Sequence, residues 1–364
     1  MNAFSANAFE AALKKPCKNA WLYLGKAPRN ESDFKHELYH QLAKLKIDNT
    51  KLNEKVPGTS SCRLHAETKI EPGRNLAKAD LAICDPTQHM AFNYDVMYVL
   101  VLKHRLNNTG VKTEMEKLAK YVKSNRHFSL ISAMPCDQSL VDLVEKLSPD
   151  EAGVHVYAPS PLLYQTAHSH DTIEEVDWKE VHKIVQANIE KVLELYGRGR
   201  TQYHGFYWCN YEQEQKKGQT YPCESDLTCQ LYHRLRGALP KNTRILTEFK
   251  PAGTNKRIDL VVTDGTTALP IEVKMNWDQF EYKRVNGVMQ EREASTILSR
   301  FALLEDDFQS VKHPKIIIIQ YDLRQRSNRR EEAISIFAKS PKLVELIAYS
   351  EESDKIVRKQ LRMK

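Results

Sequence analysis

The sequence predicts an α/β protein of two domains, each with a mixed central sheet flanked by helices. Three observations support this. The chain has 364 residues, more than one hydrophobic core usually serves. Helical segments alternate with short apolar runs typical of strands, and the same order of segments occurs twice. We place the first domain at residues 1–166 and the second at 175–364, with the junction around Ala167–Thr172.

Composition narrows the class of protein. Hydrophobic residues make up 41% of the chain and charged residues 28%, as in ordinary soluble globular proteins. The first residues lack the basic region and apolar core of a secretory signal, and no run is long and apolar enough to span a bilayer. The seven cysteines form no Cys-x-x-Cys pair, which fits a reducing compartment. We therefore expect a cytoplasmic, intracellular protein with no membrane partner.

The elements follow in the same order in both halves. A helical segment comes first, then an aromatic stretch, then a helix that opens with Glu-Ser-Asp, whose serine and aspartate suit an N-cap. Paired strands follow, then a further helix and a further strand. The segments are Ala6–Lys15 and Lys179–Leu195; Trp21–Tyr23 and Phe206–Trp208; helices opening at Glu31 and Glu224; helices Thr113–Ser124 and Glu293–Leu304; strands Phe128–Ala133 and Lys315–Gln320; and Val154–Tyr157 as the last strand of the first half.

The clearest strand pair lies in the second half. Two runs rich in β-branched residues, Ile258–Val262 and Leu269–Lys274, flank the turn-forming stretch Asp264–Thr267. This pattern predicts two antiparallel strands joined by a short loop. With those four residues as the loop, Thr263 pairs with Ala268.

Counting back from that pair places Asp259 opposite Glu272, so that two carboxylates converge. The two-residue period of a strand puts Glu272 and Lys274 on the same face. Carboxylates on adjacent strands offer the hard oxygen ligands that Mg²⁺ or Mn²⁺ prefers. A nearby ammonium can orient an attacking water and stabilise charge on a phosphate. The alternative interpretation is an exposed aspartate beside a surface Glu–Lys pair, which is common in hairpins.

An aspartate followed by Glu-x-Lys on neighbouring apolar strands resembles the core of the PD-(D/E)XK nuclease superfamily. Ile258 stands where the family pattern has a proline without a ligand role. The resemblance implies restriction-endonuclease-like domains that hydrolyse phosphodiester bonds, leaving a 5′-phosphate and a 3′-hydroxyl. We expect a nucleic-acid substrate, with DNA favoured over RNA and neither excluded. The resemblance also implies that Asp259, Glu272 and the backbone carbonyl of Val273 hold Mg²⁺ or Mn²⁺, while Lys274 positions or helps deprotonate the attacking water.

The pattern occurs twice in the chain, and the two copies differ at one decisive position. Asp80 and Lys103 correspond to Asp259 and Lys274, but Val101 stands where the second copy has Glu272. Without that carboxylate a metal loses a strand-borne ligand. We therefore predict that the first domain is a degenerate pseudo-nuclease, serving as a clamp or as a surface for a homodimer or partner protein. The matched segments are Glu31–Phe34 with Glu224–Leu227, Leu38–Leu42 with Leu231–Leu235, His65–Lys69 with Leu246–Lys250, and Ala79–Ile83 with Ile258–Val262.

Three further residues of the second copy are candidates for supporting roles. Glu224 is placed like the first-helix glutamate that some families of the superfamily add to the metal site. Glu248 precedes Asp259 by one strand, and Gln290 lies near the following helix. Each has a structural alternative: Glu31 and Glu67 occupy the places of Glu224 and Glu248 in the degenerate copy, which favours capping or packing, and Gln290 can cap a helix.

Other clusters leave alternatives open. Glu114 or Glu116 would rescue the first site if either had taken over the missing ligand, but both also suit a helix N-terminus. Cys209, Cys223, Cys229 and His233 offer four zinc ligands, although their spacing matches no common zinc module.

The net charge of +7 permits a nucleic-acid partner, and its distribution favours one. The alternative for each basic cluster is a solvated basic face. For the whole chain, the alternative to a nuclease is a non-catalytic nucleic-acid-binding or protein-interaction module built from two nuclease-like domains. The basic clusters are Lys283–Arg284; Arg324, Arg326, Arg329 and Arg330; and Arg358, Lys359, Arg362 and Lys364.

Overall fold

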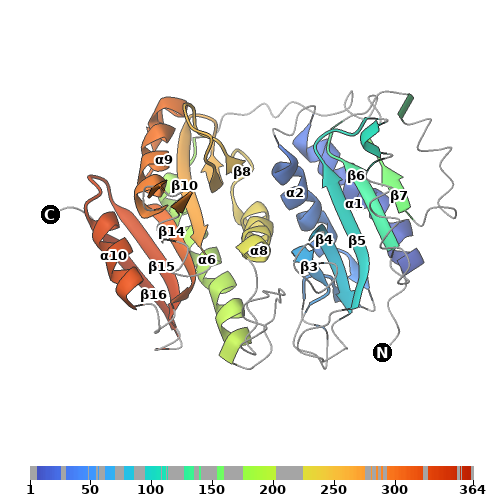
Figure 1. The fold of residues 1–364 in the computed structure, drawn as a ribbon, viewed down its shortest axis with the longest axis horizontal. Coiled ribbons are helices and arrows are strands. Elements are labelled where there is room, and N and C mark those ends of the chain that lie inside the picture. The colour runs from blue at the N-terminus through green and yellow to red at the C-terminus, as the bar shows by residue number, and fades with distance from the viewer. Residues whose placement is uncertain are drawn as a thin grey trace. The chain divides into compact units, whose positions relative to one another are not determined.

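In the computed structural model the chain forms two compact units, each built around one mixed sheet (Figure 1). Unit 1 consists of residues 1–169 with 203–229, and unit 2 of residues 170–202 with 230–364. The last of these boundaries, between residues 229 and 230, falls inside a helix. The structure describes residues 6–25, 30–47, 49–54, 56, 62–69, 78–85, 95–107, 109–111, 113, 127–134, 139–140, 154–159, 175–201, 224–274, 280, 284–285, 288–289, 293–322, 327–350, 353 and 355–361.

Unit 1 has a five-stranded sheet in the order β3-β4-β5-β6-β7. β3 (Leu64–Lys69), β4 (Lys78–Asp85) and β5 (Asp95–Lys103) run antiparallel to their neighbours, whereas β5, β6 (His127–Ser132) and β7 (Val154–Tyr157) run parallel. The expected strands around Phe128–Ala133 and at Val154–Tyr157 are confirmed. A separate ribbon pairs β1 (Lys46–Ile47) with β2 (Thr50–Lys51).

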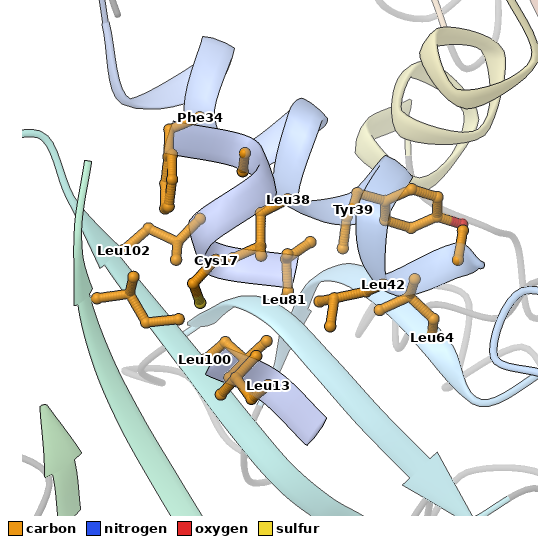
Figure 2. Packing of buried hydrophobic residues seen from close by; sticks show 14 of the residues in the cluster. Leu13, Cys17, Phe34, Leu38, Tyr39, Leu42, Leu64, Leu81, Leu100 and Leu102 are labelled. Atoms are coloured by element: carbon orange, nitrogen blue, oxygen red, sulfur yellow. The ribbon is translucent and has the colours of Figure 1, made fainter. Parts of the chain in front are cut away.

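Two helices of unit 1, α1 (Ala6–Leu24) and α2 (Glu31–Ala43), share one hydrophobic core with the sheet. Figure 2 shows Leu13 and Cys17 of α1, Leu38 and other residues of α2, and Leu100 of β5 packed together. Alternate sheet residues face these helices, as the two-residue period of a strand requires.

The expectation that the first helix ends at Lys15 is wrong, because α1 continues through Pro16 to Leu24 and includes the aromatic stretch. The residues beyond Pro16 continue the buried stripe: Cys17 and Ala20 are fully buried, and Trp21 stacks on Phe34. A proline inside a helix removes one backbone hydrogen bond, and burial of this stripe offsets the loss.

The Glu-Ser-Asp helix of unit 1 begins differently from the sequence prediction. Asn30 is the N-cap of α2, and its side chain accepts a hydrogen bond of 2.8 Å from the Asp33 backbone N–H. Ser32 and Asp33 therefore lie within the first turn, where both are buried.

Unit 2 has the sheet order β16-β15-β14-β10-β9-β8, and the short β13 also pairs with β10. The five strands from β8 to β15 repeat the order and directions of β3 to β7, and β16 adds an antiparallel edge strand. The expected strand at Lys315–Gln320 is confirmed within β14. The strands are β8 (Arg244–Phe249), β9 (Ile258–Thr263), β10 (Thr267–Lys274), β13 (Ser310–Val311), β14 (Lys315–Asp322), β15 (Val344–Ser350) and β16 (Lys355–Leu361), with β11 (Arg284–Val285) and β12 (Val288–Met289) forming a separate pair.

Three helices accompany this sheet: α6 (Trp178–Thr201), α9 (Glu293–Asp307) and α10 (Ser327–Ala338). A further helix, α8 (Glu224–Ala238), is divided between the two units. The buried residues of α9 and α10 join one core with β9, β10, β14 and β15, while α6 packs along β14, β15 and β16. None of the helices in the described ranges is long and apolar enough to cross a membrane. The remaining predicted segments, including most of Thr113–Ser124, the aromatic stretch Phe206–Trp208 and the junction, lie outside the described residues.

Candidate functional site

The strand pair β9–β10 has the register that the sequence predicts. Thr263 pairs with Ala268, and the ladder continues to the pair Leu260 and Ile271. The next positions along the two strands are Asp259 and Glu272, so the two carboxylates belong to neighbouring positions across the ladder.

The connecting loop is held by one side chain. Asp264 Oδ1 accepts hydrogen bonds from the backbone N–H of Thr266 at 2.9 Å and of Thr267 at 2.7 Å. Gly265 has φ +101, a conformation that glycine adopts without steric cost. This turn chemistry sets the register, and the register aligns the two carboxylates.

The three predicted catalytic side chains lie together. Lys274 Nζ is 2.7 Å from Glu272 Oε1 and 4.0 Å from Asp259 Oδ2. Asp259 Oδ2 accepts a hydrogen bond of 2.7 Å from the Val273 backbone N–H. The Val273 carbonyl, expected as a metal ligand, accepts a hydrogen bond of 2.9 Å from Lys274 Nζ. Glu272 and Lys274 are both buried, so they are not a surface pair.

A fourth residue, Arg300 of α9, joins this group. Its Nη2 donates to Glu272 Oε1 at 2.9 Å and to Glu293 Oε1 at 2.8 Å, and its Nη1 donates to the Arg257 carbonyl. Sequence reasoning missed Arg300. The signal was present, because the arginine occupies the buried side of α9 beside Ile297 and Phe301, where a charge needs a partner.

One oxygen of Glu272 has no hydrogen-bond partner. Its Oε2 is buried and unpaired, whereas Oε1 is bound by both Lys274 and Arg300. A buried carboxylate oxygen without a partner is unfavourable, and a divalent cation would satisfy it. Two adjacent carboxylates suit Mg²⁺ or Mn²⁺ as a donor set. Within the described ranges, no cluster of three or more His, Cys, Asp and Glu side chains is suited to hold a metal.

Unit 1 has the same backbone arrangement at this point without the second carboxylate. Asp80 Oδ2 accepts a hydrogen bond of 2.7 Å from the Leu102 backbone N–H, the counterpart of the Asp259–Val273 contact. Leu81 pairs with Leu100, which puts Asp80 opposite Val101. Burial raises the pKa of Asp80 from 3.8 to about 6, although the Leu102 amide opposes the shift.

Glu67 and Glu248 occupy equivalent, unusual backbone positions. Both have positive φ, 49 for Glu67 and 44 for Glu248, in the left-handed region that glutamate rarely adopts. In each unit the ladder pairing skips this residue, which lies across from Asp80 or Asp259. Such a backbone costs about 1–3 kcal/mol per residue. The two units therefore share this distortion beside the aspartate.

The side chains of these two glutamates pair with cations. Glu67 Oε1 is 2.8 Å from Lys35 Nζ, and Glu248 pairs with the exposed side chain of Arg257. The structure thus gives Glu248 an ion pair one strand away from the Asp259–Glu272 group.

The other candidates divide between described and undescribed parts of the chain. Glu224 is the first residue of α8, and its counterpart Glu31 accepts a hydrogen bond of 3.1 Å from the His104 N–H just beyond β5. Glu31 thus ties α2 to the end of that strand. Cys229 is buried. The candidates outside the described residues are Gln290, Glu114, Glu116, Cys209 and Cys223.

Of the basic clusters, the one that includes β16 is the best described. Arg358 Nη2 lies 2.7 Å from Glu190 Oε1 of α6, so its charge is balanced within unit 2. Lys359, the next residue of β16, is exposed. The contribution of Arg358 to a basic surface is therefore smaller than the sequence suggests.

Neither a comparison with models of known protein families nor a search of curated proteins finds a match to this chain.

Proposed function

We propose that unit 2 is a metal-dependent nuclease that hydrolyses phosphodiester bonds, with Asp259, Glu272 and Lys274 as its catalytic residues. The observation that carries the proposal is the buried Glu272, which follows the pair Ile271–Leu260 in the ladder and so comes opposite Asp259. Its Oε1 is 2.7 Å from Lys274 Nζ, and its Oε2 has no hydrogen-bond partner. An exposed hairpin pair would not bury a carboxylate in this way.

The strand order supports the same proposal. A helix followed by three antiparallel strands, then a helix and a strand parallel to the third, is the arrangement that the PD-(D/E)XK resemblance implies. The chain has this order in α8, β8, β9, β10, α9 and β14, and unit 1 repeats the strand order. We propose that both units are restriction-endonuclease-like and that unit 1, with Val101, is a pseudo-nuclease.

Each residue has a role in this proposal. Asp259 and Glu272 Oε2 would hold Mg²⁺ or Mn²⁺, which when bound would lower the pKa of a water and neutralise charge on the phosphate. Lys274 would orient the attacking water and stabilise the charge that develops on the scissile phosphate. The Val273 N–H holds Asp259 in its position by the 2.7 Å hydrogen bond. The substrate would be nucleic acid, with DNA favoured over RNA.

The test is Mg²⁺-dependent cleavage of plasmid DNA, single-stranded DNA and RNA by the full chain. Glu272→Gln and Lys274→Ala should each reduce cleavage at least about a hundredfold, the usual scale for losing a catalytic group. Glu345→Gln is the matched control, because Glu345 is also a buried strand glutamate, on β15, but it accepts a hydrogen bond from Gln186 of α6. Equal cleavage by all proteins would refute the proposal. Retained binding without cleavage in any of them would favour a non-catalytic module.

A further inference from the structure

Arg300 connects three elements that meet at the proposed site. Its buried guanidinium reaches the Arg257 carbonyl just before β9, Glu272 on β10 and Glu293 in the first turn of α9. A planar guanidinium can hold several acceptors at fixed angles, which a lysine cannot. Arg300 therefore fixes the position of Glu272 relative to the strand that carries Asp259.

The same contacts make the two carboxylate oxygens of Glu272 different in their hydrogen bonding. Oε1 accepts from Lys274 at 2.7 Å and from Arg300 at 2.9 Å, and Oε2 accepts nothing. A cation entering the site would therefore find Oε2 as the open oxygen. Releasing Oε1 would require breaking two charge-assisted hydrogen bonds in a buried environment, which is costly.

The charges of the group point to one ion. The carboxylates of Asp259, Glu272 and Glu293 face the cations Lys274 and Arg300, which leaves a single net negative charge. One divalent ion would convert it to a single positive charge, which matches the single negative charge of a phosphodiester. A second divalent ion would meet unfavourable positive charge. The carboxylate of Glu248, which lies across the ladder from Asp259, is already paired with Arg257.

We propose that Arg300 is a positioning residue of the proposed nuclease site, holding Glu272 Oε1 so that Oε2 is left for a cation, and that the site takes one divalent ion. The inference rests on the proposed function. It adds a residue outside the Asp and Glu-x-Lys motif, together with a definite metal stoichiometry.

The test uses Mn²⁺ titration calorimetry on the full chain, alongside DNA cleavage. The number of Mn²⁺ ions bound at the site is the number bound by wild type minus the number bound by Glu272→Gln. We expect this difference to be one. Arg300→Gln leaves the buried Glu272 with one cation fewer, so a divalent ion gains more there, and the Mn²⁺ dissociation constant should fall about tenfold. Cleavage should fall at least about tenfold, because Glu272 is no longer held.

Arg300→Lys keeps the positive charge but loses the planar guanidinium that binds several acceptors at once. Its Mn²⁺ dissociation constant should stay within about threefold of wild type, with cleavage between wild type and Arg300→Gln. Lys342→Gln is the matched control, because Lys342 is also ion-paired in unit 2, with Glu305, but belongs to neither the proposed site nor the basic clusters. It should leave metal binding and cleavage unchanged.

Tighter Mn²⁺ binding together with slower cleavage in Arg300→Gln would indicate a positioning role. A purely structural role would weaken both Mn²⁺ binding and cleavage. Two site ions in wild type, or weaker Mn²⁺ binding by a folded Arg300→Gln protein, would overturn the inference while wild-type cleavage preserved the proposed function. Wild type that neither binds Mn²⁺ through Glu272 nor cleaves DNA would overturn both.

Discussion

Asp80 gives a quantitative test of how the aspartate environment of unit 1 affects stability. Burial raises its pKa from 3.8 to about 6, with Glu31 adding to the shift and the Leu102 amide opposing it. A shift of about two units corresponds to about 3 kcal/mol in favour of the protonated form. The charged carboxylate of Asp80 is therefore a source of instability in unit 1 at neutral pH.

The sign follows from proton linkage. The folded pKa lies above the unfolded one, so the stability from protonating Asp80 is fully present below about pH 4 and is lost as pH rises through about 6. Asp80→Asn removes the charge and keeps an acceptor for the Leu102 N–H. It should raise the free energy of unfolding of unit 1 by up to about 3 kcal/mol at pH 8, and by about 1 kcal/mol near pH 4.5.

The assay is hydrogen–deuterium exchange of peptides from β4 and β5 across a urea series, at pH 8 and pH 4.5, which reports on unit 1 separately. Asp264→Asn in unit 2 is the control, because it should change the free energy of unfolding at pH 8 in the opposite direction. Burial alone would raise the pKa of Asp264, but hydrogen bonds from Thr267, Thr266 and Trp178 lower it. Its substitution should destabilise unit 2 at pH 8, with the loss shrinking as pH falls through the folded pKa. Equal destabilisation by Asp80→Asn at both pH values would refute the reasoning, since the side chain would then act as a structural hydrogen-bond acceptor.

Three further outcomes are expected. Phe301→Ala should lower the free energy of unfolding of unit 2 by about 3–5 kcal/mol in urea unfolding, because Phe301 is fully buried in its core, whereas Phe308→Ala, at a partly buried position, should cost less. Glu248→Gly should stabilise unit 2 by about 1 kcal/mol, because glycine adopts φ 44 without strain and the lost ion pair is largely exposed; a loss of stability would show that the pair outweighs the strain. Burial raises the pKa of Cys17 well above its ordinary value, so iodoacetamide at pH 8 should label it only after unfolding in urea, and labelling of the folded chain would contradict its burial.

The strand pair of unit 2 was predictable because its determinants are local. The turn residues Asp264–Thr267 set the register, and a strand's two-residue period then places Asp259 and Glu272. The same locality explains why the expected helix at Glu293–Leu304 and the strand within β14 are confirmed.

The differences come from tertiary packing. α1 passes through Pro16 because Trp21 and its neighbours continue the buried stripe against Phe34 and the sheet, and a local pattern does not contain that information. Arg300 is similar. Its position on the buried side of α9 is visible in the sequence, but its partners Glu272 and Glu293 are identified only when helix and strand pack together.

The two units together separate features of the fold from features of the proposed site. Both units have an aspartate bound to the next strand's amide and a left-handed glutamate across the ladder, although only one has the second carboxylate. Because these features also occur in the unit that lacks the second carboxylate, they do not by themselves argue for catalysis. Glu272 bound by Lys274 and Arg300, with one oxygen left unpaired, has no equivalent where Val101 stands. Introducing a glutamate by Val101→Glu alone should accordingly not create a metal site in unit 1, because a second buried carboxylate beside Asp80 would raise the pKa of both groups and favour their neutral forms.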